Sequence, residues 1–269
     1  PYLYTLTLQA GAETIEQKVG IRTISVEDGK ILINGKQVKF RGVNRHDSNP
    51  YTGAAVTRED VIRDLQLMKE SNVNAIRTSH YPNAPYFPEL CSEYGFYMIA
   101  EADLESHGVG TLYTNDGHDC MGYIAQDDAW AESILDRQKR NVIRDKNQSA
   151  VIFWSLGNES GYGGNFEDAG RWVKAYDPTR LLHYEASICN SAGYHNDVSM
   201  LDVMSRMYAD TEWVKEYCED RRMRKPFIQC EFIHAMGNGP GDIHDYMELM
   251  YKYDKFCGGF VWELSLIHI

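Results

Sequence analysis

The sequence lacks long apolar runs, an excess of basic residues and closely spaced cysteines. No apolar stretch approaches the roughly 20 residues that a membrane-spanning helix needs, so we expect no membrane partner. Lysine and arginine number 27 against 39 aspartates and glutamates, a net charge of −12 that disfavours nucleic acid as a partner. The six cysteines form no C-x-x-C pair, which argues against a zinc ribbon or a thioredoxin-like site. These absences favour a globular protein that binds a small neutral or cationic ligand.

Several catalytic motifs are also missing. The chain contains no G-x-S-x-G, no H-E-x-x-H and no P-loop lysine motif, so a serine esterase, a zinc peptidase and a nucleotide hydrolase lose their usual support. The glycine-rich turn at residues 161–164 is too short to indicate a phosphate site. Chemistry must therefore come from other side chains.

Short apolar runs alternate with amphipathic stretches from residue 40 onward. This alternation is typical of parallel strands joined by helices, and we predict an α/β fold, a (β/α)8 TIM barrel. An open doubly wound sheet would give the same alternation, but polar residues gathered after several strands favour the barrel. The predicted strands are residues 40–44, 73–77, 97–101, 151–156, 181–185, 201–204, 227–230 and 259–262. The predicted helices are residues 58–70, 84–94, 128–144, 166–176, 212–222 and 243–253.

Residues 1 to about 40 have a β-like pattern instead. Residues 2–8, 18–26, 31–33 and 37–40 resemble strands, and Asn34-Gly35 is a strong hairpin signal. This part of the chain is therefore expected to differ in architecture from the rest.

Carboxylates, imidazoles and aromatic rings follow the predicted strands. In a barrel these side chains converge at one end, where the active sites of this fold lie. Glu159 and Glu231 each follow or end an apolar strand, and a carboxylate buried there is costly without a purpose. A pair of carboxylates in different surroundings suits cleavage of a glycosidic bond, in which one acts as an acid and the other attacks the sugar or stabilises its cation.

Four sequence runs resemble the signatures of glycoside hydrolase family 2. They are NAIRTSHYP at residues 74–82, DKN at 145–147, WSLGNE at 154–159 and CEFIHAMGN at 230–238. The block EADLESHG at residues 101–108 resembles the β-galactosidase branch in particular. The resemblance extends over roughly residues 20–263.

The resemblance implies retaining hydrolysis of terminal β-D-galactosides by double displacement. Glu159 would be the general acid/base and Glu231 the nucleophile. The other expected substrate-binding residues are His46, Arg77, His80, Asn158, Tyr208, His234 and Trp262. Among them, Asn158 would bind the sugar 2-hydroxyl, Arg77 and Tyr208 would hold the nucleophile, and Trp262 would form an apolar platform.

The resemblance also implies a magnesium ion (Mg2+) held by Glu105, His107 and Glu159. Carboxylate oxygens suit this hard cation, and an ion beside the acid/base would tune its proton affinity. Glu105 and His107 could instead be a solvated surface pair, and Glu159 could merely cap the next helix.

Residues 1–27 resemble the last strands of an immunoglobulin-like β-sandwich, and residues 28–269 the catalytic barrel, without its last helix. We therefore expect a truncated chain that hydrolyses galactosides weakly or not at all. We also expect a cytoplasmic location, because acidic charge and scattered cysteines suit a reducing compartment, and a homo-oligomer for the full-length protein. The alternatives are a β-glucuronidase or β-mannosidase of the same family, and a non-catalytic carbohydrate-binding barrel.

Overall fold

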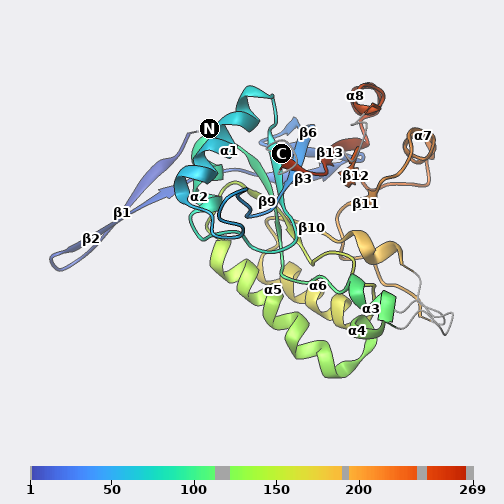
Figure 1. Ribbon diagram of the computed structural model, residues 1–269, viewed down its shortest axis with the longest axis horizontal. Coiled ribbons are helices and arrows are strands. Elements are labelled where there is room, and N and C mark those ends of the chain that lie inside the picture. The colour runs from blue at the N-terminus through green and yellow to red at the C-terminus, as the bar shows by residue number, and fades with distance from the viewer. Residues whose placement is uncertain (1, 113–121, 190–193, 235–240, 265–269) are drawn as a thin grey trace.

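Eight parallel strands form the centre of the molecule in the computed structural model, which describes residues 2–112, 122–189, 194–234 and 241–264 (Figure 1). Their order around the sheet is β10-β9-β8-β7-β6-β13-β12-β11, so the first strand of the barrel lies beside the last. The (β/α)8 TIM barrel is thereby confirmed. The strands are β6 (Phe40–Arg45), β7 (Ala75–Thr78), β8 (Tyr97–Glu101), β9 (Val151–Ser155), β10 (Leu181–His183), β11 (Met204–Met207), β12 (Phe227–Phe232) and β13 (Phe256–Val261).

β10 and β11 are the two ends of this order, and single hydrogen bonds join them instead of a ladder. The Asp202 amide donates to the Leu182 carbonyl at 3.0 Å, and the Met207 amide donates to the Glu185 carboxylate at 3.1 Å. The prediction of a strand at residues 201–204 was wrong, because β11 begins at Met204. Leu201 is buried, but it packs in the connection before the strand, so the apolar run does not mark the strand itself.

The helices begin and end largely where their caps predict. Thr57 accepts a hydrogen bond from the Asp60 amide while Asp60 accepts one from the Thr57 amide, which fixes the start of α1. Gly95 ends α2 in the left-handed conformation, with φ of 76°, which glycine adopts without strain. The helices are α1 (Arg58–Glu70), α2 (Phe87–Tyr94), α3 (His107–Leu112), α4 (Gly122–Gln126), α5 (Ala131–Asp145), α6 (Gly164–Tyr176), α7 (Thr211–Glu219) and α8 (Ile243–Lys252), with 3-10 turns at η2 (Asp128–Trp130) and η3 (Glu185–Ile188).

The N-terminal residues form two separate antiparallel units. β1 (Tyr4–Ala10) and β2 (Glu13–Val19) make a hairpin that extends away from the barrel (Figure 1). β3 (Ile24–Glu27), β4 (Lys30–Ile33) and β5 (Lys36–Gln37) form a small sheet, and the expected turn at Asn34-Gly35 joins its last two strands with φ of 52° and 71°. Ile31 and Ile33 of β4 pack into the core cluster at the start of the barrel, together with Phe40.

The predicted boundary between residues 27 and 28 falls between β3 and β4, which pair with each other. The assignment of residues 1–27 to an immunoglobulin-like sandwich stays a prediction. The expected absence of a last helix concerns residues beyond β13, of which 265–269 lie outside the described residues. In the described part of the chain, no helix is both long and apolar enough to cross a membrane.

Candidate active site

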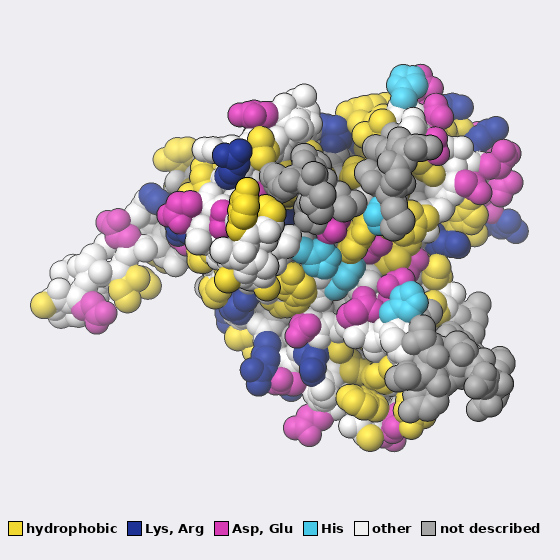
Figure 2. All heavy atoms as spheres, in the orientation of Figure 1, with side chains coloured by type: hydrophobic (Ala, Val, Ile, Leu, Met, Phe, Trp, Pro, Cys, Tyr) yellow, Lys and Arg dark blue, Asp and Glu magenta, His cyan; other side chains and the backbone are white. Residues whose placement is uncertain are grey.

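The predicted site residues come from the carboxyl ends of seven strands of the barrel. Figure 2 shows histidine side chains grouped in the middle of one face, beside acidic side chains. Arg77 lies within β7, Glu231 lies within β12, and the remaining residues follow directly after strands: His46 after β6, His80 after β7, Glu105 and His107 after β8, Asn158 and Glu159 after β9, Tyr208 after β11, His234 after β12 and Trp262 after β13.

Glu231 is held from two sides by hydrogen-bond donors. Arg77 Nη1 donates to its Oε1 atom at 2.9 Å, and the Tyr208 hydroxyl donates to its Oε2 atom at 3.1 Å. The Glu231 side chain is only 8% exposed. A carboxylate with one donor on each oxygen has a fixed orientation, which is what a reacting nucleophile requires.

Arg77 is completely buried, and each of its five N–H donors has an acceptor. Burial alone would lower the pKa of Arg77, but the carboxylates of Glu101 and Glu231 outweigh it and raise the pKa. The guanidinium is therefore a permanent cation next to the predicted nucleophile. Its acceptors are Glu101 Oε2 at 2.7 Å, Glu101 Oε1 at 2.9 Å, Asn158 Oδ1 at 2.8 Å, Asn44 Oδ1 at 3.0 Å and Glu231 Oε1 at 2.9 Å.

Glu101, at the end of β8, is a central residue that the sequence analysis missed. Burial alone would raise the pKa of Glu101, but the Arg77 charge and the hydrogen bond from His80 lower it to about 2. His80 Nδ1 lies 2.9 Å from its Oε1 atom, so this nitrogen carries a hydrogen. The signal was present, since Glu101 follows apolar strand residues just as Glu231 does.

Tyr208 is close enough to both predicted catalytic carboxylates to be influenced by their charges. Burial and then the charge of Glu231 raise the pKa of Tyr208, and Glu159 adds to the effect. The hydroxyl therefore stays protonated and donates to Glu231. Its φ of 50° lies in the left-handed region, which is strained for a tyrosine and typical of functional sites.

Glu159 has a more open position. Its side chain is 36% exposed, and His107 Nδ1 lies 2.8 Å from its Oε2 atom. The hydrogen bond to Glu159 and the charge of this carboxylate raise the pKa of His107. Glu159 also has a positive φ, of 27°, so the chain turns sharply directly after Asn158.

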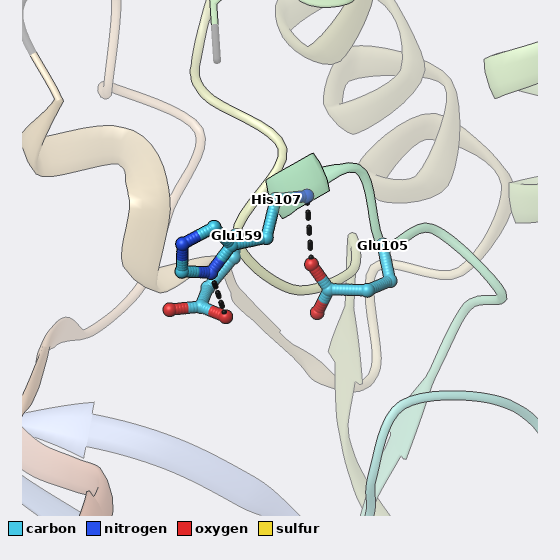
Figure 3. Close-up of side chains that lie close together, drawn as sticks. All are labelled: Glu105, His107 and Glu159. Atoms are coloured by element: carbon cyan, nitrogen blue, oxygen red, sulfur yellow. Dashed lines mark hydrogen bonds and ion pairs between the residues drawn. The ribbon is translucent and has the colours of Figure 1, made fainter. Parts of the chain in front are cut away.

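Glu105, His107 and Glu159 point toward one another (Figure 3). One ligand atom from each lies within 4.8 Å of the others, and Asn158 Nδ2 donates to Glu105 Oε2 at 2.5 Å. Two carboxylates and one imidazole on a partly exposed surface leave room for water ligands. This donor set fits a hard divalent cation.

The rings of His46, His80 and Trp262 form one aromatic group. Trp262 stacks on His80 at 5.1 Å with an angle of 12°, and both rings meet His46 edge to face. His46 Nε2 lies 3.5 Å from Glu263. Burial lowers the pKa of His46, and the nearby His80 and Arg77 lower it further against the opposite effect of Glu263. The three predicted residues are thus brought together.

His234 is joined to this group by no described contact. Its Nδ1 atom is buried without a hydrogen-bond partner among the described residues. The chain that follows, residues 235–240, lies outside the described part.

Glu185, after β10, is a second residue that the sequence analysis missed. Burial raises the pKa of Glu185 to about 7, and the charge of Glu231 adds to this effect. The Met207 amide donates to its Oε1 atom. A further buried carboxyl group, which changes protonation near neutral pH, therefore lies near the predicted nucleophile.

The chain is similar in sequence to known proteins. The chain is 49% identical over 284 residues to a protein named beta-galactosidase from Actinobacillus pleuropneumoniae, covering 98% of this chain and 28% of that protein. It is 46% identical over 264 residues to a beta-galactosidase from Staphylococcus xylosus, covering 98% and 27%. The chain thus spans about a quarter of the length of these relatives.

Solved structures show the same fold at lower identity. A β-glucuronidase from Ruminococcus gnavus in complex with uronic isofagomine matches with a TM-score of 0.78 and 20% identity, covering 97% of this chain and 51% of that chain. At this identity the match concerns the fold alone. The family model for glycosyl hydrolases family 2, TIM barrel domain, matches residues 24–269, so the chain belongs to glycosyl hydrolase family 2.

Proposed function

We propose that this barrel carries out retaining hydrolysis of terminal β-D-galactosides, with Glu231 as nucleophile and Glu159 as general acid/base. The observation that carries the proposal is the fixed Glu231 carboxylate beside Arg77 and Tyr208, at the same barrel end as the more exposed Glu159. Relatives named beta-galactosidase at 38–49% identity support a galactoside as the substrate.

In the first step, Glu231 attacks the anomeric carbon and the glycosidic oxygen leaves with a proton from Glu159. Arg77 and Tyr208 keep Glu231 oriented and leave its remaining lone pairs for the sugar. In the second step, Glu159 takes a proton from water, and this water releases the sugar from Glu231. The two carboxylates lie in different environments, since the Glu231 side chain is 8% exposed and the Glu159 side chain is 36% exposed.

Other residues would bind and orient the sugar. Asn158 already binds Arg77 through Oδ1 and Glu105 through Nδ2, so the 2-hydroxyl would take the second Nδ2 hydrogen, in place of its longer contacts with His80 Nε2 at 3.4 Å and Glu159 Oε2 at 3.5 Å. His46, His80 and His234 would contact sugar hydroxyls or the transition state, and Trp262 would lie beneath the apolar face of the ring. The stacking of Trp262 on His80 supports the proposal that these two rings contact the same sugar.

Glu105, His107 and Glu159 would hold Mg2+. Bound there, the ion would supply a positive charge that tunes the proton affinity of the acid/base. One ligand atom from each of the three side chains lies within 4.8 Å of the others, and Figure 3 shows the side chains close together.

A β-glucuronidase would need a cation for the carboxylate of its substrate. Arg77, the arginine between the predicted catalytic residues, has no donor left for such a carboxylate. Arg77 therefore cannot be the cation that would bind the carboxylate of a glucuronide.

We also propose a cytoplasmic location and a homo-oligomeric full-length protein, which cell fractionation and light scattering would test.

Covalent trapping tests the proposal even if turnover is slow. A 2-deoxy-2-fluoro-β-D-galactosyl fluoride should transfer its sugar to Glu231 with loss of fluoride, and peptide mass spectrometry should locate the adduct. The Glu231→Gln variant is the control and should stay unlabelled. The matching glucuronyl and mannosyl fluorides should label more slowly, and faster labelling by either would favour the alternative substrates. No adduct with any sugar, together with retained galactoside binding, would favour a non-catalytic barrel.

A further inference from the structure

A buried histidine of the barrel wall is connected through Ser155 to Glu101. His183 of β10 is fully buried, with Nδ1 at 2.9 Å from the Ser155 hydroxyl and Nε2 at 2.9 Å from the Ser205 hydroxyl. The Ser155 hydroxyl in turn lies 2.8 Å from Glu101 Oε2. None of these contacts belongs to the mechanism described above.

The register of the strands explains why these side chains lie next to one another. Glu101 pairs with Ser155 in the β8–β9 ladder, and Ser155 pairs with His183 in the β9–β10 ladder. Ser205 lies on β11, across the point where the sheet has no ladder between β10 and β11. The hydrogen bond between His183 and Ser205 therefore helps to join the two ends of the barrel sheet.

The direction of each hydrogen bond follows from its acceptor. Glu101 is ionised and can only accept, so the single hydroxyl hydrogen of Ser155 points to Glu101. Ser155 must then accept from His183, which places a hydrogen on Nδ1.

The other ring nitrogen of His183 is the acceptor. Burial, followed by the charge of Arg77, lowers the pKa of His183 to about 3, so the ring is neutral and Nε2 has no hydrogen. Ser205 must therefore donate to Nε2. All the donors in this chain point toward Glu101.

Ser155 is one of four donors that saturate the Glu101 carboxylate. The others are Arg77 Nε, Arg77 Nη2 and His80 Nδ1. Four donors match the lone-pair capacity of a carboxylate, so the position of Glu101 is fully determined. Because Glu101 holds Arg77 at two nitrogens, the same contacts fix the guanidinium that binds Glu231.

We propose that His183 is a positioning residue, which as the Nδ1–H tautomer fixes the donor order Ser205, His183, Ser155, Glu101 and thereby orients Arg77 against Glu231. The effect of His183 on reaction rate rests on the proposed function, whereas its tautomer does not. The experiments below keep these two parts distinct.

NMR of the protein labelled with 15N in histidine tests the tautomer. Wild type should show His183 as a neutral Nδ1–H ring, unchanged between about pH 5 and pH 8. In Ser155→Ala the Nδ1 hydrogen loses its acceptor, so the ring should change to Nε2–H and donate to Ser205. In Ser205→Ala it should remain Nδ1–H. An Nε2–H ring in wild type, a charged ring, or no change in Ser155→Ala would overturn the donor order.

The Arg77 Nε–H resonance and the rate of labelling by the fluorosugar test the positioning. Ser155→Ala and His183→Leu should shift this resonance and slow labelling about 10-fold, while His183→Gln, which keeps one donor and one acceptor, should recover most of the rate. Ser92→Ala is the matched control, because it also removes a buried hydroxyl with two hydrogen bonds, but beside the start of β9. It should leave both readouts unchanged.

The outcomes separate the two proposals. If His183→Leu does not fold, Ser155→Ala still tests the inference. An unshifted Arg77 resonance with labelling within about 2-fold of wild type in a folded Ser155→Ala would overturn the positioning role. Absence of labelling in wild type would contradict the proposed function, while the tautomer and the Arg77 resonance would still decide the inference.

Discussion

Glu231 and Glu159 both lie near the carboxyl end of an apolar barrel strand, but they differ in their exposure to solvent. Glu231 is nearly buried, and its two oxygens accept hydrogen bonds from Arg77, which is completely buried, and from Tyr208. Glu159 is 36% exposed, and His107, whose Nδ1 atom lies 2.8 Å from it, is 57% exposed. A nucleophile needs a fixed position, whereas an acid/base must exchange protons with water and with the leaving group. The difference therefore matches the two proposed roles.

Because of this difference, substitutions near the two carboxylates should affect stability and activity differently. Around Glu231, removal of one group leaves buried charges without partners, so it should affect folding as well as reaction rate. Around Glu159, the solvent can replace a lost contact, so a change should affect the reaction alone. Four measurements can sharpen or break this contrast.

Arg77→Met should have the largest effect. The substitution leaves Glu101 buried without its cation, and we expect the free energy of unfolding to fall by about 3–5 kcal/mol, measured by urea denaturation. Labelling of Glu231 should become too slow to detect. Arg140→Met is the control, since it removes an arginine that is 79% exposed and paired with Asp136, and it should cost less than about 1 kcal/mol.

Glu159→Gln should separate the two properties. We expect hydrolysis to slow by about 10²–10⁴-fold for substrates whose leaving group needs a proton, and far less for a dinitrophenyl galactoside. The free energy of unfolding should change by less than about 1 kcal/mol. A loss of stability comparable to that of Arg77→Met would contradict the contrast between the two carboxylates.

Glu185→Gln should change how stability depends on pH. The pKa of Glu185 rises from 4.5 to about 7 on folding, so its contribution is complete below pH 4.5 and is lost as pH rises through 7. Glutamine does not titrate and can still accept from the Met207 amide. The stability of the variant relative to wild type should therefore increase by on the order of 3 kcal/mol between about pH 4 and pH 8. A constant difference over this range would show that Glu185 titrates normally.

Removal of a predicted Mg2+ ligand should have the smallest effect on the fold. We expect Glu105→Gln and His107→Ala to weaken Mg2+ binding at least about 10-fold in calorimetric titrations, with little change in unfolding. His244→Ala is the control, because His244 is an exposed histidine paired with Glu248 on α8. Equal Mg2+ affinity in all these proteins would remove the proposed metal site.

Patterns in short runs of sequence were enough to predict the barrel and most of the site. Apolar runs followed by polar residues indicated the strands. Glu231 was marked as unusual because this carboxylate follows apolar residues of the same strand, such as Ile228. The same reasoning placed Tyr208 correctly although it put β11 three residues too early. Such signals are local, because they depend on the burial of a strand and on the residue at its end.

Three features were missed because they depend on pairing between strands. Glu101 and Glu185 were visible as carboxylates at the ends of apolar strands, but only the register showed which cations and amides they meet. The link from His183 through Ser155 to Glu101 requires three strands in one alignment.

The sequence by itself determined the family, the alternation of strands and helices, and the two glutamates that we propose as catalytic. The tertiary structure alone decided that Glu231 is nearly buried and hydrogen-bonded to Arg77 and Tyr208, while Glu159 is partly exposed to solvent. The physical reason is that residue type and periodicity are properties of neighbours in the chain. Burial, charge and hydrogen-bond direction arise only when residues far apart in sequence become neighbours in space.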